Sequence, residues 1–84
     1  MQNNNILITG GAGFIGSHLA ERLAYENNVC ILDDFSRGKR SDIDHIDCSV
    51  INIDLSSDDI PESIIETTDI VFHLASSVGS YKFY

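Results

Sequence analysis

The chain has 84 residues, 43% of them hydrophobic, and its 13 acidic and five basic side chains give a net charge of −8. Its length allows one small domain at most, and its acidity argues against a nucleic acid or an anionic membrane as a partner, because both require a basic surface. No apolar run approaches the ~20 residues of a membrane span, and the polar start, residues 1–5, lacks the basic region and cleavage site of a signal peptide.

Residues 6–9 are three branched apolar side chains followed by a threonine, a run that predicts a buried parallel strand. Four glycines then fall within seven positions: Gly10, Gly11, Gly13 and Gly16. They fit G-x-G-x-x-G counted from Gly11 and G-x-x-G-x-x-G counted from Gly10, and both spacings predict a phosphate-binding turn between a strand and a helix. An early glycine permits the tight turn, a middle one lets the backbone approach a pyrophosphate, and Gly16 lets the helix pack closely on the strand.

The segment from residue 14 to about residue 26 has the pattern of an amphipathic helix. Its predicted apolar stripe is Phe14, Ile15, Leu19 and Leu23. Asn27 and Asn28 predict the end of the helix. The N–H groups and the positive dipole at its start would face the phosphates of a bound dinucleotide. No lysine follows the glycines, which excludes the nucleotide-triphosphate loop G-x-x-x-x-G-K-[ST].

Residues 29–32 predict a second buried strand, and Asp33 and Asp34 follow it directly. Dinucleotide-binding folds place an acid at the tip of the second strand, about 20 residues after the glycines, where it accepts hydrogen bonds from the adenosine ribose. Asp33 lies 23 positions after Gly10 and fits this role. Its carboxylate would repel a 2′-phosphate, so the sequence predicts NAD in preference to NADP. A solvated strand end is the alternative interpretation of both aspartates.

A loop over residues 35–41 holds three of the five basic residues. They are Arg37, Lys39 and Arg40. This loop could form an adenine-side wall with Arg37 near the base, a 2′-phosphate site, or an ordinary solvated surface. Asp33 argues against the phosphate site. The next residues, 42–47, are acidic and carry Ile43 and Ile46 at a spacing that fits one helical turn.

Residues 49–53 predict a third strand that ends at Asp54 and Leu55. In the helix expected next, Asp58 or Asp59 can cap the start and Pro61 suits the first turn. Its predicted apolar side is Ile60, Ile64 and Ile65. Residues 69–75 predict a fourth strand, and the small polar residues 76–80 predict a loop.

The histidines and cysteines do not form a site of their own. We interpret His73 as packed beneath the glycine turn rather than as a general base. His18 and His45 have no partners at metal-ligand spacing, so no metal is expected. Cys30 and Cys48 lie in apolar runs, which favours small buried side chains in a reducing cytoplasm over a disulfide.

Four stretches together resemble the extended short-chain dehydrogenase/reductases, and within them the NAD-dependent epimerase/dehydratase enzymes that act on nucleotide sugars. The stretches are residues 9–16 (T-G-G-A-G-F-I-G), residues 32–40 (L-D-D-F-S-R-G-K-R), Asp54-Leu55, and His73-Leu74-Ala75. Because members of that family are several times longer, we expect residues 1–84 to be the amino-terminal part of an NAD-binding Rossmann domain, without the catalytic and substrate-binding regions.

The resemblance implies a partial doubly wound α/β fold, βαββαβ, with a parallel sheet of strand order 3-2-1-4. It implies that Asp54 and Leu55 line the adenine, and that residues 74–76 run beside the phosphates and the nicotinamide ribose. The complete set of predicted NAD contacts is Gly10, Gly13, Phe14, Ile15, Gly16, Asp33, Asp34, Ser36, Arg37, Gly38, Asp54, Leu55, Leu74, Ala75 and Ser76.

In this family NAD oxidises a sugar C4 hydroxyl to a transient ketone, assisted by a Tyr-x-x-x-Lys pair whose lysine lowers the tyrosine pKa. None of Tyr25, Tyr81 and Tyr84 has a lysine four positions on, so no catalytic residue is expected among these 84. The resemblance favours a homodimeric enzyme like UDP-glucose 4-epimerase. A nucleotide-sugar 4,6-dehydratase, a UDP-glucuronate decarboxylase and a non-catalytic NAD(P)-sensing module remain as alternatives.

Overall fold

The structure is a computed structural model that describes residues 2–10, 14–35, 38–54 and 59–74. Its elements in chain order are β1 (Asn5–Thr9), α1 (Phe14–Leu23), β2 (Asn28–Asp33), the 3-10 helix η1 (Arg40–Asp42), β3 (Ser49–Asn52), α2 (Glu62–Thr67) and β4 (Ile70–His73). All strand pairs are parallel, and the order across the sheet is β3-β2-β1-β4. This confirms the predicted α/β fold and its strand order.

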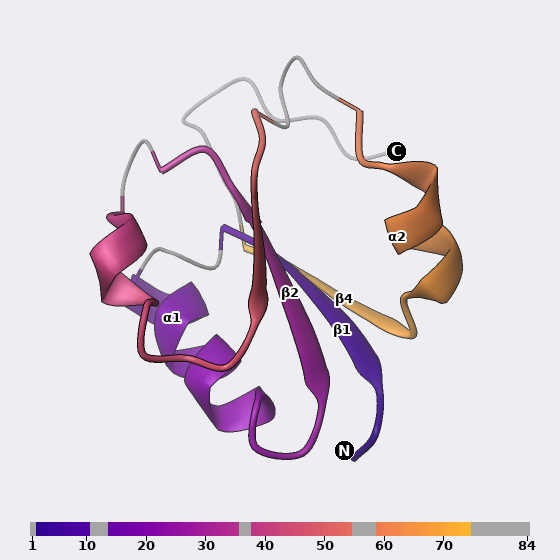
Figure 1. The fold of residues 1–84 in the computed structure, drawn as a ribbon, viewed down its shortest axis with the longest axis horizontal. Coiled ribbons are helices and arrows are strands. Elements are labelled where there is room, and N and C mark those ends of the chain that lie inside the picture. The colour runs from indigo at the N-terminus through magenta and orange to yellow at the C-terminus, as the bar shows by residue number, and fades with distance from the viewer. Residues whose placement is uncertain (1, 11–13, 36–37, 55–58, 75–84) are drawn as a thin grey trace.

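The two faces of the sheet are covered by different connections. Helix α1 and η1 lie on one side of the sheet, and α2 lies on the other (Figure 1). The chain builds outward from β1 through β2 to β3, then returns to the far side of β1 to form β4. Because parallel crossovers are right-handed, this reversal of direction puts α2 on the opposite face. The carboxyl ends of β1 and β4 therefore flank the topological switch point, where open α/β sheets bind their ligands.

The larger core lies on the α1 side of the sheet. Its buried members are Ile6, Ile8, Ala20, Val29, Ile31, Ile43 and Ile46. Ile43 and Ile46 are 1% and 9% exposed, although the only regular structure beside them is the three-residue η1. Together they cover β2 and β3 as a crossover helix would. The helical turn predicted over residues 42–47 is not a helix, because η1 covers only Arg40–Asp42. Ile43 and Ile46 instead belong to a turn closed by the Ile46 N–H, which donates to the Ile43 carbonyl at 3.0 Å.

Helix α1 packs on the sheet through small residues. Gly16 and Ala20 are its buried positions, and the close packing predicted for Gly16 is observed. The predicted stripe is wrong for Phe14 and Ile15, which are 82% and 70% exposed. The reason is that a stripe through residues 16, 20 and 23 also has helical spacing, and its small members allow the helix to approach the strands more closely.

The end of α1 comes earlier than the sequence suggested. The helix stops at Leu23 rather than near residue 26. The side-chain amide of Asn27 donates to the Leu23 carbonyl at 3.0 Å, and the Glu26 N–H donates to the same oxygen at 3.3 Å. The Asn27 side chain thus satisfies a carbonyl at the end of the helix, but the stop predicted at Asn27 and Asn28 is about three residues too late, and Asn28 already belongs to β2.

Helix α2 covers the other face with fewer contacts. Ile60 and Ile64 pack against the smaller core of Leu7, Leu32 and Ile53. Ile65 is 57% exposed, so its predicted place on the apolar side is wrong. Pro61 stands at the N-cap rather than in the first turn, and no side chain forms a capping hydrogen bond there. With six residues, α2 presents little more than one turn to the sheet.

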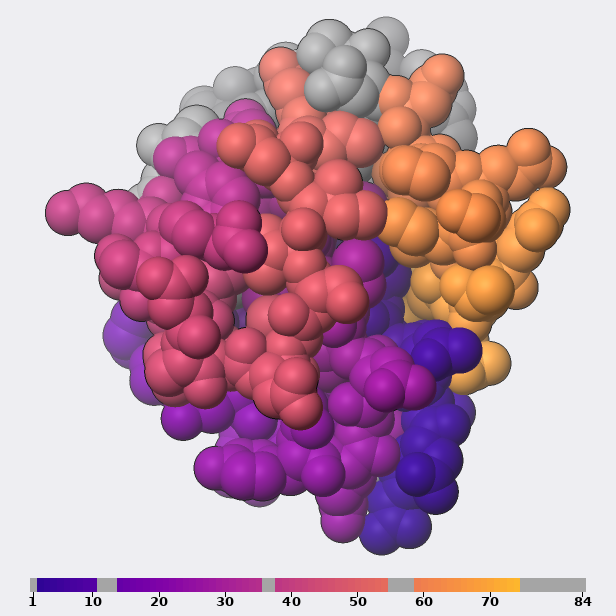
Figure 2. Space-filling model, in the orientation of Figure 1, coloured from indigo at the N-terminus to yellow at the C-terminus, as the bar shows by residue number. Residues whose placement is uncertain are grey.

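Strand β4 forms an edge of the described sheet, with β1 as its neighbour. Residues 59–74 lie along one flank of the molecule (Figure 2). Val71 is 56% exposed on this strand. At the start of β1, the Asn5 N–H donates to Asp69 Oδ2 at 2.7 Å, and the Asn5 side-chain amide donates to the Thr67 carbonyl at 2.9 Å. These bonds hold the connection from α2 to β4 against the central strand.

We predict that Ile43→Ala lowers the free energy of unfolding by about 2–5 kcal/mol, because it removes a fully buried side chain and leaves a cavity. The matched control, Ile65→Ala, removes an exposed side chain and should change it by less than about 0.5 kcal/mol. Urea-unfolding midpoints and slopes of the full-length variants measure both effects. Equal destabilisation by the two substitutions would contradict the role given to Ile43.

Candidate functional site

Backbone hydrogen bonds between neighbouring strands continue one residue past the carboxyl ends of β1 and β4. The Gly10 N–H donates to the Leu32 carbonyl at 2.8 Å, and the Leu74 N–H donates to the Thr9 carbonyl at 2.9 Å. These bonds tie the first residue after β1 to β2, and the first residue after β4 to β1. Gly10, Leu74 and the residue that follows Leu32, Asp33, therefore lie along one edge of the sheet.

Gly10 makes the turn out of β1. Its φ is 78°, in the left-handed region where a Cβ would meet the backbone. The chain therefore leaves the plane of the sheet directly after Thr9. The next described residue is Phe14, where α1 begins. Gly13, the middle glycine of the predicted turn, lies outside the described residues.

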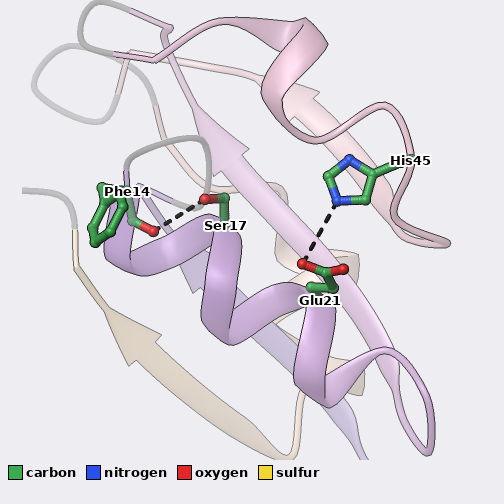
Figure 3. A network of polar contacts seen from close by, with 4 residues as sticks. All are labelled: Phe14, Ser17, Glu21 and His45. Carbon is green, nitrogen blue, oxygen red and sulfur yellow. Dashed lines mark hydrogen bonds and ion pairs between the residues drawn. The ribbon is translucent and has the colours of Figure 1, made fainter.

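The start of α1 carries the exposed Phe14 and Ile15. The Ser17 hydroxyl donates to the Phe14 carbonyl at 3.0 Å (Figure 3). The Phe14 ring also meets the His18 ring edge-on, with a centroid distance of 4.8 Å. The first N–H groups of a helix have no partner within the helix, so they can donate to an anion. The helix start thus combines donor groups with an apolar surface, and its contact with a cofactor remains a prediction.

Farther along α1, Glu21 faces the turn that follows η1. His45 Nε2 and Glu21 Oε2 lie 3.6 Å apart, and both side chains are about half exposed (Figure 3). Exposed pairs of this kind contribute little to stability, roughly 0–1 kcal/mol. The contact adds to the buried Ile43 and Ile46 in holding this turn beside the helix.

Asp33 is held by its backbone and by its side chain. Its carbonyl accepts from the Ile53 N–H at 3.0 Å, and its Oδ1 accepts from the Phe35 N–H at 2.8 Å. Phe35 has a φ of 60°, again in the left-handed region. The Asp33 side chain is half-buried, whereas Asp34 beside it is exposed.

The other predicted contacts divide by location. Asp54 follows β3 and is exposed, Gly38 follows β2 and is half-buried, and Leu74 is 37% exposed. Six predicted positions lie outside the described residues: Gly13, Ser36, Arg37, Leu55, Ala75 and Ser76. The structure thus brings the described candidates to the ends of the strands, and their contact with a cofactor stays a prediction.

Thr9 and His73 join β1 to β4 just below this edge. They are paired in register, and the buried Thr9 hydroxyl shares a hydrogen bond of 2.8 Å with His73 Nδ1. Burial lowers the pKa of His73, so the imidazole is neutral at neutral pH. Because Thr9 directly precedes Gly10, His73 lies beside the last residue of β1, next to the point where Gly10 leaves the strand. Its predicted place beneath the whole glycine turn stays a prediction, because residues 11–13 lie outside the described residues.

The two cysteines are free thiols, and both are half-buried. Burial raises the pKa of Cys30 and of Cys48, which favours the protonated thiol over the thiolate at neutral pH. Within the described ranges, no group of three or more His, Cys, Asp or Glu side chains is gathered around a possible metal position. The described helices are also too short to cross a membrane.

Two features of this edge were missed by the sequence analysis. One is the left-handed Phe35, for which the signal was an aspartate two residues earlier, since Asp side chains commonly accept from the backbone two residues on. The other is the Thr9–His73 bond, which depends on the register of β1 against β4. A one-residue shift would move one of the two side chains to the other face.

Fold and strand-end geometry together define a dinucleotide-binding class of α/β domain. Residues 6–83 match the model of the NAD dependent epimerase/dehydratase family, and the chain belongs to that family. NAD is therefore the cofactor of the family to which this chain belongs.

Relatives of known reaction support this assignment. UDP-glucuronic acid decarboxylase 4 of Arabidopsis thaliana is 38% identical over 81 residues, which are 93% of this chain and 18% of the relative. UDP-N-acetyl-alpha-D-glucosaminuronate decarboxylase of Bacillus cytotoxicus is 41% identical over 76 residues, 87% of this chain and 24% of the relative. The chain thus spans about a fifth of the length of the curated relatives it matches.

Solved structures agree with the fold. The UDP-N-acetylglucosamine 4-epimerase from Methanobrevibacter ruminantium M1 superposes with a TM-score of 0.82 at 38% identity, over 94% of this chain and 26% of that one. The Bordetella bronchiseptica enzyme WbmF, solved in complex with NAD+, gives a TM-score of 0.74 at 27% identity, over 93% and 24% of the two chains.

We predict that His73 makes stability depend on pH. Because its folded-state pKa is lowered, protonation favours the unfolded chain. The stability it contributes is fully present above the ordinary histidine pKa of about 6.5 and is lost as the pH falls through the folded-state pKa. His73→Asn, which keeps a side-chain amide near Thr9, should lose less stability than the wild type on acidification.

Unfolding midpoints measured at about pH 7.5 and 5.5 would test this. The exposed His18, changed to Asn, is the matched control. If the wild type and His73→Asn lose the same stability between the two pH values, the neutral, buried state assigned to His73 is wrong.

Proposed function

We propose that this chain binds NAD along the carboxyl edge of its sheet, as part of an enzyme that modifies a nucleotide sugar. The observation that carries the proposal is the placement of two groups at the carboxyl ends of β1 and β2, next to the switch point. The Gly10 turn is bonded to Leu32, and the next residue is Asp33. These contacts hold the turn beside the acid. A phosphate of the dinucleotide can approach the backbone of the turn, and the acid can bind a ribose.

The residues fit a dinucleotide in shape and charge. With a φ of 78°, Gly10 has a conformation that a Cβ would disfavour, and it makes the tight turn out of β1. The approach of the backbone to a pyrophosphate is proposed for Gly13. The chain has a net charge of −8, so the phosphates would be held mainly by backbone N–H groups at the turn and at the start of α1. In this arrangement Asp33 accepts hydrogen bonds from the adenosine ribose, Asp54 lies on the adenine side, and Leu74 lies toward the nicotinamide.

The proposed substrate is a nucleotide sugar, because the relatives and structural neighbours act on such molecules. They differ in outcome: decarboxylases, 4-epimerases and an NAD dependent-NDP-hexosamine 5,6-dehydratase are among them. When bound, NAD would accept a hydride from the sugar. We favour a reaction like that of UDP-glucose 4-epimerase, with decarboxylation or dehydration as the alternative outcomes.

The catalytic base is proposed to lie elsewhere in the protein. The sequence contains no Tyr-x-x-x-Lys pair, and the relatives are about four to six times as long as the stretch that they share with it. We therefore propose that residues 1–84 are the amino-terminal part of an NAD-binding domain in a homodimeric, cytoplasmic enzyme. A non-catalytic NAD(P)-sensing module is the alternative of another class.

Turnover separates these possibilities. The full-length protein should convert UDP-glucose, UDP-glucuronate or another UDP-sugar in the presence of NAD, with the product identified by chromatography. NAD binding without conversion of any nucleotide sugar would favour the sensing module instead.

We predict that Asp33→Ala weakens NAD binding by about 10- to 100-fold and weakens NADP binding much less. The substitution removes charged acceptors that NAD uses and also relieves repulsion of the 2′-phosphate of NADP. Titration of the full-length protein with each cofactor measures the change. Asp47→Ala, which removes an exposed aspartate after η1, is the matched control and should affect neither cofactor. An equal loss for NAD and NADP would remove Asp33 from the ribose role.

A further inference from the structure

Phe35 holds a backbone conformation that its side chain does not favour. Its φ is 60°, in the left-handed region that is unfavourable for a residue with a Cβ. Within the described ranges, the other non-glycine residue with positive φ is Asn3, and asparagine tolerates this region better than most residues. A phenylalanine stays there only where surrounding contacts enforce it.

Two contacts enforce the conformation of Phe35. Its side chain is half-buried and packs against the core on the α1 side of the sheet. Its N–H donates to Asp33 Oδ1 at 2.8 Å, closing a turn over the end of β2. The core contact anchors the residue, and the left-handed backbone turns its N–H back toward the carboxylate.

The same bond fixes the orientation of Asp33. Its main chain is already held by the Ile53 N–H, so the bond from Phe35 restricts the remaining freedom, which is rotation of the carboxylate. An ionised carboxylate has about four acceptor sites, and the bond from the Phe35 N–H occupies one of them. The Phe35 N–H thus helps to set the direction of the carboxylate through a single acceptor site.

We propose that Phe35 is a positioning residue that holds the Asp33 carboxylate in place and thereby sets the preference for NAD over NADP. The inference rests on the function proposed above, in which Asp33 meets the adenosine ribose. A carboxylate held in one direction accepts from the ribose hydroxyls of NAD and repels a 2′-phosphate at the same position. A carboxylate free to rotate would turn toward water, and both effects would weaken.

Two substitutions separate the backbone role of Phe35 from its packing. Phe35→Asn and Phe35→Val both remove the ring and keep the N–H. Asparagine is enriched in the left-handed region, whereas a β-branched valine is a genuine outlier there. A purely structural role would make the two variants alike in cofactor preference, since both lose the same core contact.

The experiment titrates the full-length wild type and both variants with NAD and with NADP. Thermal midpoints are measured alongside to confirm that each variant is folded. The ratio of the NADP to the NAD dissociation constant should stay close to the wild-type value in Phe35→Asn and fall roughly tenfold in Phe35→Val. In an Asp33→Ala background, exchanging Phe35 for valine should leave the ratio unchanged, because the group that it positions is absent.

The outcomes distinguish this inference from the proposed function. A wild type that does not bind NAD would overturn the proposed function, and the inference with it. A wild type that prefers NAD, with the same ratio retained in Phe35→Val, would overturn the positioning role alone. If the ratio falls equally in Phe35→Asn and Phe35→Val, the loss of preference comes from removing the ring. That result would also overturn the role proposed for the left-handed backbone of Phe35. If Phe35→Val does not fold, Phe35→Leu, which keeps an apolar side chain but tolerates the left-handed region less well than asparagine, replaces it in the comparison.

Discussion

The hydrogen bond from the Gly10 N–H to the Leu32 carbonyl, 2.8 Å long, joins the glycine turn to the end of β2. It forms because β1 and β2 pair in parallel with Thr9 beside Leu32, and because Gly10 leaves the strand with positive φ. Asp33 is the next residue after Leu32. The register of the sheet therefore sets the distance between the Gly10 turn, where we propose that the pyrophosphate binds, and Asp33, which we propose binds the ribose. This distance does not depend on the surrounding loops.

The packing of β1 makes the register between β1 and β2 rigid. The alignment of β1 with β4 on its other side is held differently. Ile6, Leu7 and Ile8 are at most 2% exposed and are covered on both faces. A site built on such a strand is held more accurately than one built on loops. Toward β4 the sheet has an edge with an exposed Val71. There the alignment depends more on polar bonds, chiefly the one between Thr9 and His73.

Much of this arrangement follows from sequence pattern. Branched apolar runs locate the strands, right-handed crossovers give their order, and the distance from Gly10 to Asp33 predicts two groups at one edge. Hydrophobicity predicted the packed side of α1 only in part: Leu19 and Leu23 pack against the core as expected. The small Gly16 and Ala20 are the buried positions of the helix, and Phe14 is exposed. The family match supports the fold and the cofactor, whereas the individual contacts depend on side-chain geometry.

The conformation of Phe35 shows why the other details of the fold and of the candidate site could not be predicted from the sequence. Its own propensity opposes a left-handed backbone, and the conformation is imposed by a core contact with residues distant in sequence and by a bond to Asp33. Ile65 is a similar case, because it lies about 100° around the helix from Ile64, and the side of α2 that packs on the sheet takes Ile64 and leaves Ile65 exposed. Both depend on tertiary packing, which overrides local preference.

The most direct measurement is a crystal structure of the full-length protein with NAD. We expect a pyrophosphate beside the Gly10 turn and the start of α1. We also expect an adenosine ribose hydroxyl within about 2.5–3.0 Å of the Asp33 carboxylate, while the Phe35 N–H still donates to that carboxylate. A dinucleotide bound away from this edge of the sheet, or a ribose that does not touch Asp33, would contradict these expectations.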